Sequence, residues 1–544
     1  MQKRFFLIII LILSFSGVVF SQYIFRPESY KLLETNLFGY SVKNQLSQIK
    51  ASIITNPVNS KYPISNFITD IFPTGDTVWF ATGSGIMRTI NNFVSFQHYY
   101  GISPFGEDDI SGFVVKDNFI VVATAISQEI SGENIPVGTG IKVSTDRGVS
   151  WNSFPQPVDG SADSNIVYGN NTLYALPVVV PQQNLTYDIA VTRTKNTNDN
   201  ITIWITSFAG GLRKSTDLGN TWQRVVLPPD NLDSININTT GYTFSLNPRN
   251  NLNHRAFTIE ALNDSTIIVG TANGINISTD WGISWRKYTF QNSGIGINRL
   301  SGNFVVNLHI QRFNNQSVIW AATRRAEDPN EVNAISYTTN LGQSWRYTLK
   351  DISPNGISSK DSLVYAETDG GLWRARFGFF DWSKPSIIYD ETTKDVLKTS
   401  SFYCGSNIGD TLFFGSADGL LRTIETGQPW LGRWKIYRAM QVIDLNSDIK
   451  TYAAPNPFSP SSEVTRIFYK TGKSTSKVTI KIFDFGMNPV RTLIQNAIRT
   501  NPDELFTMWD GKNNNGYQVA NGVYFYRIEI DDDPPIWGKI LVLQ

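Results

Sequence analysis

The sequence predicts an all-β protein, a seven-bladed β-propeller followed by a small β-sandwich, and three observations support this. An eight-residue pattern that ends in Trp recurs along the chain, short apolar segments precede each copy, and the pattern stops before the carboxyl-terminal residues. Repeating units that each form one small sheet cannot bury both of their faces alone. They close most simply into a ring of blades, so we expect a propeller over residues 61–445.

The recurring pattern is [ST]-x-[DN]-x-G-x-[ST]-W. An Asp or Asn side chain can accept hydrogen bonds from nearby backbone N–H groups, and Gly can take the positive φ that a tight turn requires. The Trp arrives as the next strand begins and can cover the turn. We expect a self-capped hairpin turn at four copies: Ser144, Asp146, Gly148 and Trp151; Ser215, Asp217, Gly219 and Trp222; Ser278, Asp280, Gly282 and Trp285; and Thr338, Asn340, Gly342 and Trp345.

These four copies resemble the Asp-box, also called the BNR repeat, of sialidases, sortilin-type receptors, xyloglucan-degrading hydrolases and photosystem-assembly propellers. The resemblance implies a β-propeller in which the boxes lie at the periphery of the blades and are structural. It implies little about activity.

A strand pair precedes each box. An apolar, β-branched run is followed by a Gly and a short alternating segment, which is the pattern of two strands. Counting copies with a decayed box gives seven units, with second segments at 85–89, 141–144, 211–215, 274–278, 334–338, 371–374 and 419–423. Residues 164–200 could enlarge the third blade or form an eighth, and part of residues 22–60 could supply a strand that closes the ring.

The amino-terminal residues predict export. Lys3 and Arg4 precede an apolar run from Phe5 to Leu13, and small Ser21 follows at a cleavage-site position. The alternative is a membrane anchor, but the continuous apolar run is shorter than the roughly 20 residues that span a bilayer. We therefore expect a signal peptide at residues 1–21, export through the periplasm, and a secreted or surface-attached chain.

The carboxyl-terminal residues form a second module. Residues 446–463 contain Pro455, Pro457 and Pro460, which exclude helix and central strand, so this segment is expected to be a linker and edge. Strand-like runs over residues 464–544 suggest a small β-sandwich.

This module resembles the FlgD-type immunoglobulin-like domain, which in many exported proteins is the type IX secretion sorting domain (T9SS type A). The resemblance implies an Ig-like fold and the type IX secretion machinery as partner. A permanently retained accessory sandwich is the alternative. The resemblance rests on Pro455, Asn456, Pro457, Phe458, Trp509, Asp510, Gly511, Gly522, Tyr524 and Lys539.

Loops of variable length predict a binding face. If the box is the turn between the third and fourth strands of a blade, the longer loops share the opposite face, and loops on a rigid scaffold commonly bind ligands. We expect a protein or polysaccharide ligand there, and an aromatic sugar platform of Tyr99, Tyr100 and Phe105 is possible. Buried strand aromatics are the alternative. The candidate residues are Tyr99, Asp108, Asp109, Arg324, Arg325, Glu327 and Asp328.

Other chemistry is less favoured. The net charge of +1 gives no field that would attract nucleic acid, and His98, His254 and His309 lack the spacing of metal ligands, so we predict no cofactor and no metal. A glycoside hydrolase or sialidase-like enzyme remains the alternative, because loop carboxylates such as Asp108 and Glu327 could flank a cleft. We assign no catalytic residue and expect a binding protein.

Overall fold

The computed structural model describes residues 53–543, except 131, 198–199, 394, 398, 440–449, 461–463, 501 and 503. The signal peptide expected at residues 1–21 lies outside the described residues. Those residues form strands and one three-residue 3-10 helix, η1 (Leu252–His254), so none of their helices could cross a membrane. The all-β prediction is confirmed. The chain divides into two compact units, which are described separately.

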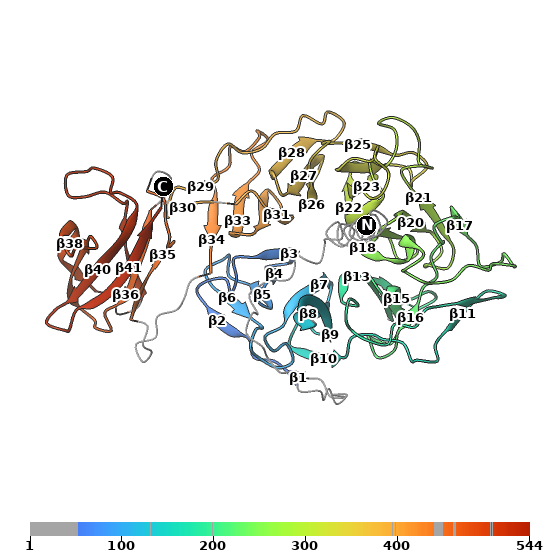
Figure 1. The fold of residues 1–544 in the computed structure, drawn as a ribbon, viewed down its shortest axis with the longest axis horizontal. Helices are drawn as coiled ribbons and strands as arrows, with labels where there is room; N and C mark the ends of the chain where they lie inside the picture. Colours follow the sequence, from blue (N-terminus) through green and yellow to red (C-terminus); the bar gives the residue numbers. More distant parts are fainter. Residues whose placement is uncertain are drawn as a thin grey trace, which may run out of the picture. The chain divides into compact units, whose positions relative to one another are not determined.

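The first unit contains seven sheets of three to five strands, which we number as blades in chain order (Figure 1). Their strands, written in order across each sheet, are as follows. The first blade is β2 (Val58–Ser60), β6 (Phe96–His98), β5 (Ile86–Thr89), β4 (Thr77–Thr82) and β3 (Ile68–Thr74); the second is β1 (Ile53–Ile54), β10 (Ser150–Phe154), β9 (Glu133–Ser144), β8 (Phe119–Ile130) and β7 (Asp109–Lys116). The third is β13 (Thr186–Arg193), β14 (Ile201–Ser207), β15 (Gly211–Ser215) and β16 (Gln223–Arg224); the fourth is β18 (Ala256–Ala261), β19 (Ile267–Thr271), β20 (Gly274–Ser278), β21 (Trp285–Tyr288) and β17 (Ser234–Ile235). The fifth is β22 (Phe304–Phe313), β23 (Gln316–Arg324), β24 (Ala334–Thr338) and β25 (Arg346–Thr348); the sixth is β26 (Pro354–Lys360), β27 (Leu363–Thr368) and β28 (Gly371–Arg376); the seventh is β31 (Phe402–Ile408), β32 (Thr411–Ser416), β33 (Gly419–Ile424) and β34 (Lys435–Tyr437).

The seven sheets close into a ring. The first long strand of each blade contacts the first long strand of the next, in the order β3, β7, β13, β18, β22, β26 and β31, and β31 contacts β3 in turn. Within each blade, strands that follow one another in the chain lie side by side and antiparallel in the sheet, beginning with the first strand and continuing outward. The propeller predicted from the sequence is therefore confirmed.

Two expectations about individual segments can now be compared with the structure. Residues 164–200 supply a separate hairpin, β11 (Asn165–Tyr168) with β12 (Asn171–Tyr174), and the whole first strand of the third blade, β13. Strands β1 and β2 pair with β10 and β6 at the outer edges of two blades, so the described part of residues 22–60 does not close the ring. Ring closure comes from contact between β31 and β3 instead.

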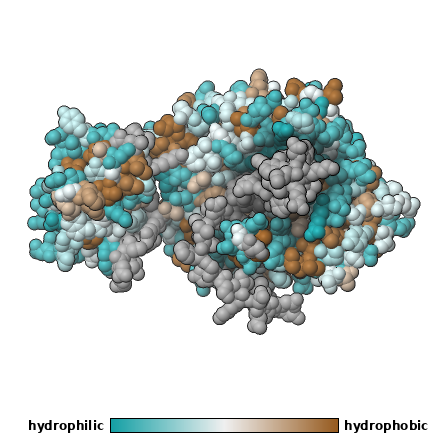
Figure 2. Space-filling model, viewed as in Figure 1, coloured by the Kyte–Doolittle hydropathy of each residue, from teal (hydrophilic) through white to brown (hydrophobic). Residues whose placement is uncertain are grey.

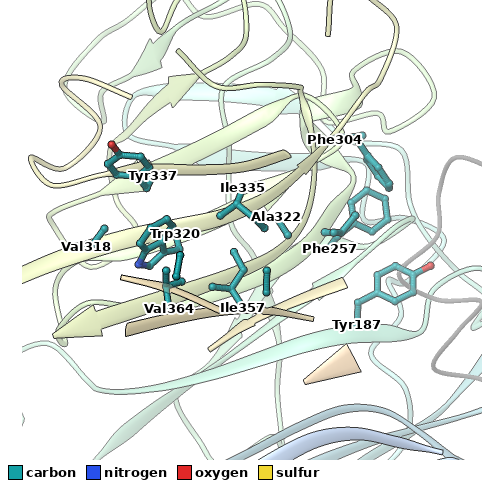
Figure 3. Packing of buried hydrophobic residues seen from close by; sticks show 14 of the residues in the cluster. Tyr187, Phe257, Phe304, Val318, Trp320, Ala322, Ile335, Tyr337, Ile357 and Val364 are labelled. Atoms are coloured by element: carbon teal, nitrogen blue, oxygen red, sulfur yellow. The ribbon is translucent and has the colours of Figure 1, made fainter. Parts of the chain in front are cut away.

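The core of the first unit lies between successive blades. Trp320 and Ile335 of the fifth blade face Ile357 and Val364 of the sixth (Figure 3). The Trp320 ring is fully buried, and its Nε1 donates to Gln311 Oε1 at 2.8 Å. Both faces of such a sheet are covered by neighbours, which explains why the middle strands read as continuous apolar runs.

Three hydrogen bonds recur in all four copies of the repeated turn. In the second blade, Ser144 Oγ donates to Asp146 Oδ1 (2.8 Å), the Gly148 N–H donates to Ser144 Oγ (2.8 Å), and the Ser150 N–H donates to Asp146 Oδ1 (2.9 Å). Two successive residues, Arg147 and Gly148, have φ of 60° and 82°. The turn therefore satisfies its own backbone donors in a left-handed conformation that favours Gly at the second position.

Each repeated turn also contacts the preceding blade. A Cβ atom added at Gly148 would lie 2.7 Å from the ring of Trp79 in the first blade, and one added at Gly282 would lie 2.6 Å from the ring of Trp204 in the third. Gly219 and Gly342 meet Phe154 and Tyr288 of their preceding blades in the same way. The Gly is thus required both by the backbone conformation and by the close approach of an aromatic ring.

The first blade has Phe93 where the other turns have Gly. Its φ is 70°, its N–H donates to Thr89 Oγ1, and its ring stacks on Phe413 of the seventh blade with centroids 5.2 Å apart. Tyr437 lies at the same centroid distance from the Phe93 ring. Phe93 therefore inserts where the last blade meets the first.

The second unit is a two-sheet sandwich. One sheet contains β35 (Thr451–Ala454), β36 (Thr465–Lys470) and β39 (Glu504–Trp509), and the other contains β38 (Pro489–Arg499), β37 (Ser476–Phe483), β40 (Gly522–Ile530) and β41 (Ile536–Val542). Ile480, Trp509 and Tyr526 are among its fully buried residues. A hairpin of β29 (Tyr389–Asp390) and β30 (Asp395–Val396) also belongs to this unit, since Arg466 Nη1 lies 2.6 Å from Asp395 Oδ1.

Replacing Phe93 with Ala should weaken ring closure. The change removes a buried aromatic side chain and leaves a cavity, so the free energy of unfolding of the propeller should fall by about 3 kcal/mol. Urea unfolding followed by Trp fluorescence measures this. Val94→Ala is the control, because the adjacent Val94 side chain is 72% exposed and its loss should have little effect. An equal effect of the two substitutions would contradict the role given to Phe93.

Candidate ligand-binding face

The face opposite the repeated turns carries the longer loops, and we call it the loop face. The repeated turns join the third strand of a blade to the fourth, as β9 is joined to β10. The turns between second and third strands, and the connections between blades, therefore lie at the other end of each sheet. On the side that Figure 2 shows, hydrophobic residues form several separate patches among hydrophilic ones.

Tyr99 and Phe105 cannot form a sugar platform in this structure. Both rings are almost completely buried and pack around Trp151, with the Phe105 and Trp151 centroids 4.9 Å apart. Loss of hydration raises the pKa of Tyr99 to about 12. The placement of Tyr99 on the binding face is therefore corrected, because an apolar connection between blades is filled by its own aromatic side chains.

Asp108 and Asp109 are held by the scaffold. Asp108 Oδ2 accepts a hydrogen bond from Thr139 Oγ1 (2.6 Å), and its charge acts on buried Lys142. Burial lowers the pKa of Lys142 to about 8. Asp109 begins β7 and is 4% exposed. These two carboxylates lie at the loop face but contribute mainly to its internal contacts.

Arg324 is the last residue of β23, and Arg325, Glu327 and Asp328 lie in the loop between β23 and β24. Arg324 Nη2 donates to Pro354 O of the next blade (2.7 Å), and Asp328 Oδ1 accepts from the Asn330 N–H (2.9 Å). Arg325 and Glu327 are exposed. Of the four, Arg325 and Glu327 are therefore the best placed for contact with a ligand.

A buried polar residue recurs beneath the loop face, two residues after Gly140, Gly211, Gly274 and Ala334 in the strands that lead into the four boxes. Each interacts with the connection that enters its own blade, through a hydrogen bond or ion pair in three of the pairs and through charge alone in the pair of Lys142 with Asp108. The four pairs are Lys142 with Asp108, Arg213 with Asp159, Asn276 with Asn253, and Ser336 with Ser301.

A small pocket opens beside one of these pairs. It has a cavity volume of about 20 Å³, formed by the β14–β15 turn, the segment after β16 and the residue that ends η1. Of its lining residues, Arg224 pairs through Nη2 with Asp159, which also pairs with Arg213 Nη1 (2.8 Å). The lining residues are Ala209, Gly210, Gly211, Leu212, Arg224, Val225, Leu227, Leu246, Pro248 and His254.

His254 is neutral in this pocket. Its Nε2 lies 3.1 Å from Leu227 O, which is only an acceptor, so Nε2 carries the ring proton. Burial lowers the pKa of His254 to about 4. Its Nδ1 is therefore a hydrogen-bond acceptor, and no partner for it occurs among the described residues.

Two acids also meet near the propeller axis, on neighbouring first strands. Asp188 accepts hydrogen bonds from Thr258 Oγ1 (2.8 Å) and the Ile259 N–H (2.9 Å). Loss of hydration and the charge of Asp188 raise the pKa of Glu260 to about 8. The donors around Asp188 give it a structural role between the third and fourth blades.

The sequence did not point to Asp159, Arg224 or His254. One signal was available: Arg213 occupies the same position after its strand Gly as Lys142 does. Because a buried cation needs a partner, two basic residues at the same position of strands that are expected to be buried indicate that each meets an acid. Within the described residues, no group of His, Cys, Asp and Glu could hold a metal ion.

Comparisons with known proteins give structural likenesses only. No protein family and no curated protein matches the chain. Among solved structures, PorZ, a surface component of the type IX secretion system of Porphyromonas gingivalis, is 12% identical over 87% of this chain and 75% of its own, with a TM-score of 0.28. The Niastella koreensis GH74 enzyme is 12% identical over 89% and 74%, with a TM-score of 0.45. YCF48 bound to D1 peptide is 13% identical over 69% and 97%, with a TM-score of 0.39.

Acid should destabilise the propeller partly through His254. In the folded chain the pKa of His254 is about 4, below its ordinary value of 6.5. As the pH falls, this residue therefore binds a proton in the unfolded chain before it does so in the folded chain, and the free energy of unfolding decreases between pH 6.5 and about pH 4. The loss is about 3 kcal/mol. Urea midpoints of the wild-type chain and His254→Gln should therefore converge between pH 7 and pH 4. A constant difference across this range would contradict the assignment.

Proposed function

We propose that the chain is an exported, non-catalytic propeller protein that binds a protein or polysaccharide ligand on its loop face. The observation that carries this proposal is the difference between the two faces. The repeated turns satisfy their own donors and pack against the preceding blade, as Gly148 does against Trp79. The loop face carries the exposed Arg325 and Glu327 and the pocket beside His254.

The non-catalytic part of the proposal rests on how the acids are held. Asp108 accepts from Thr139, Asp109 is buried, and Asp328 accepts from Asn330. Glycosidase carboxylates must instead face a cleft at a set separation. A glycoside hydrolase or sialidase-like enzyme is the alternative function, and it would need Glu327 with a second acid.

Loop-face binding can be tested on an array of proteins and of neutral and acidic polysaccharides. Replacing both Arg325 and Glu327 with Ala should weaken binding of a retained ligand at least tenfold, because both exposed charges of one loop are removed. Val149→Ala is the control, since Val149 is exposed on a repeated turn. If the chain hydrolyses a glycan of the array, and Asp108→Asn or Glu327→Gln abolishes that hydrolysis, the non-catalytic proposal is rejected.

We propose further that the second unit is a type IX secretion sorting domain, as the sequence resemblance implies. Two of its motif residues, Asn456 and Phe458, contact the last strand. The Phe458 N–H donates to Leu541 O (3.0 Å), Asn456 Oδ1 accepts from the Leu541 N–H (2.8 Å), and the Phe458 ring packs on Trp509. This arrangement supports a role for Asn456 and Phe458 in fixing the carboxyl-terminal strand, the part that the proposal assigns to recognition.

Deleting residues 454–544 should abolish export if the second unit is the sorting signal. The chain should then accumulate inside the producing cell, while the full chain appears in the medium or on the surface. Cell fractions are compared by immunoblot, and limited proteolysis checks that the shortened propeller is folded. Unchanged export of a folded, shortened chain would reject the sorting role and favour a retained accessory sandwich.

A further inference from the structure

One sheet of the second unit exposes aromatic and basic side chains together. In the sheet of β38, β37, β40 and β41, alternate residues such as Ile482, Tyr526 and Ile540 are buried in the core of the sandwich. The residues between them therefore lie on the opposite side of the sheet, which we call the outer face. The members of the outer face that matter here are Lys481, Phe483, Phe525, Arg527, Trp537 and Lys539.

Aromatic rings form a continuous row across the outer face. Phe483 lies directly opposite Phe525 on the neighbouring strand, and its ring centroid is 5.5 Å from that of Trp537. The row extends to Phe485, in the turn after β37, whose ring centroid is 6.2 Å from that of Phe525. Phe485 is 76% exposed and Trp537 is 43% exposed. The two ends of the row are therefore accessible to a ligand.

Basic side chains lie beside these rings without an equal number of acids. Lys481 and Arg527 are directly opposite one another on neighbouring strands. Like charges in this position on one side of a sheet repel each other and destabilise it. Arg527 pairs with Glu529, but Lys481 and Lys539 form no ion pair among the described residues. An anionic ligand would relieve this repulsion.

The other acids near the outer face lie in the turns of the sheet. Asp484 accepts a hydrogen bond from the backbone of its own turn (2.8 Å), and Asp531, after β40, pairs with Lys473 (3.1 Å). The Lys477 N–H also donates to Asp531 Oδ1 (2.8 Å), so Lys477 lies at the acidic end of the sheet. Charge is therefore balanced at that end, whereas the middle of the outer face is positive.

The arrangement of rings and cations indicates the kind of ligand. Both occur in each of two adjacent rows that cross the strands, namely Lys481, Arg527 and Trp537, and Phe483, Phe525 and Lys539. A lipid surface would remove water from these cations, because they are not confined to the border of the apolar area. A sugar ring can place its C–H groups on an aromatic ring while its carboxylate meets a cation. Neighbouring strands are about 4.8 Å apart, close to the length of one sugar unit in an extended chain.

We propose that the outer face binds an acidic polysaccharide that lies across the strands. Sugar rings stack on Phe485 and Trp537, the two exposed ends of the aromatic row, and sugar carboxylates pair with Lys481 and Lys539. This site goes beyond the proposed function, because it lies on the second unit and does not depend on the loop face. It gives the second unit a role besides sorting, which is to hold the chain on an acidic polysaccharide.

Calorimetric titration of the full chain with hexagalacturonate, at constant ionic strength, tests this proposal. Hexagalacturonate should bind, and cellohexaose should bind at least tenfold more weakly because it has no carboxylates. Lys481→Glu should weaken hexagalacturonate binding at least tenfold because it replaces an attraction with a repulsion, and Trp537→Ala should do the same because it removes a stacking surface. No binding by the wild-type chain, or equal binding of the two oligosaccharides, would overturn the proposal.

Lys477→Glu is the matched control for Lys481→Glu. Both lysines belong to β37 and lie on the outer face, and both substitutions change the net charge of the chain equally, but Lys477 lies beside Asp531. Lys477→Glu should bind hexagalacturonate as the wild-type chain does. Equal weakening by the two substitutions would reduce the effect to net charge and overturn the proposal. Urea midpoints of both variants check that Lys481→Glu, which keeps every ring in place, is folded.

Two further probes distinguish other anionic partners. Poly-L-glutamate that binds as tightly as hexagalacturonate, with no loss in Trp537→Ala, would assign the outer face to acidic peptides. Vesicles of phosphatidylglycerol that bind the wild-type chain but not Lys481→Glu, while hexagalacturonate binds neither, would assign it to lipid. Either result would overturn the polysaccharide proposal.

The variant with both Arg325 and Glu327 replaced by Ala separates this inference from the proposed function. It should bind hexagalacturonate as the wild-type chain does. If it loses this binding while Lys481→Glu keeps it, the loop-face function is retained and the outer-face proposal is rejected. If Lys481→Glu loses the binding and no ligand on the array depends on the loop face, the outer-face proposal is retained and the loop-face function is rejected.

Discussion

The close contact between each repeated turn and an aromatic side chain of the preceding blade is the constraint on which the fold depends. Two successive left-handed residues reverse the chain, and the second of them, such as Gly148, lies so near Trp79 that no side chain fits between them. The same residue therefore forms the hairpin and sets the distance between blades. At the seam of the ring, Phe93 fills this position and supplies an aromatic ring to the seventh blade.

The repeated turns pack against neighbouring blades on one face of the propeller, and the longer loops lie on the opposite face. The connections there are held by buried polar pairs, of which Arg213 with Asp159 is the most strongly charged. Where such a pair is exactly matched, as Asn276 with Asn253, the connection is simply fixed. In the third blade a second guanidinium, from Arg224, joins the pair, so one buried carboxylate holds the third and the fourth strand of the blade to the connection that enters it.

The fold could be predicted because its constraints are local in sequence. The spacing of Asp146, Gly148 and Trp151 is fixed by one turn, and the strands before it follow from alternation of apolar residues. The site could be predicted only in part, because it joins residues from separate connections. Nothing in the sequence near Asp159 indicates that it meets Arg224, and loop length does not reveal that Tyr99 turns inward. The decayed first box likewise concealed the position of Phe93, since the pattern marks a Gly there.

One continuous stretch of chain forms the first four strands of each blade, or the three strands of the sixth blade. The strands added outside this stretch are short and lie at the outer edge of the sheet. New chain ends placed between two blades would therefore leave these stretches whole, and a duplicated stretch would arrive with its own turn. In such a ring the number of blades is governed by the angle at which neighbouring sheets pack. Gain or loss of a blade during evolution would then require only a modest repacking of the aromatic side chains at each boundary.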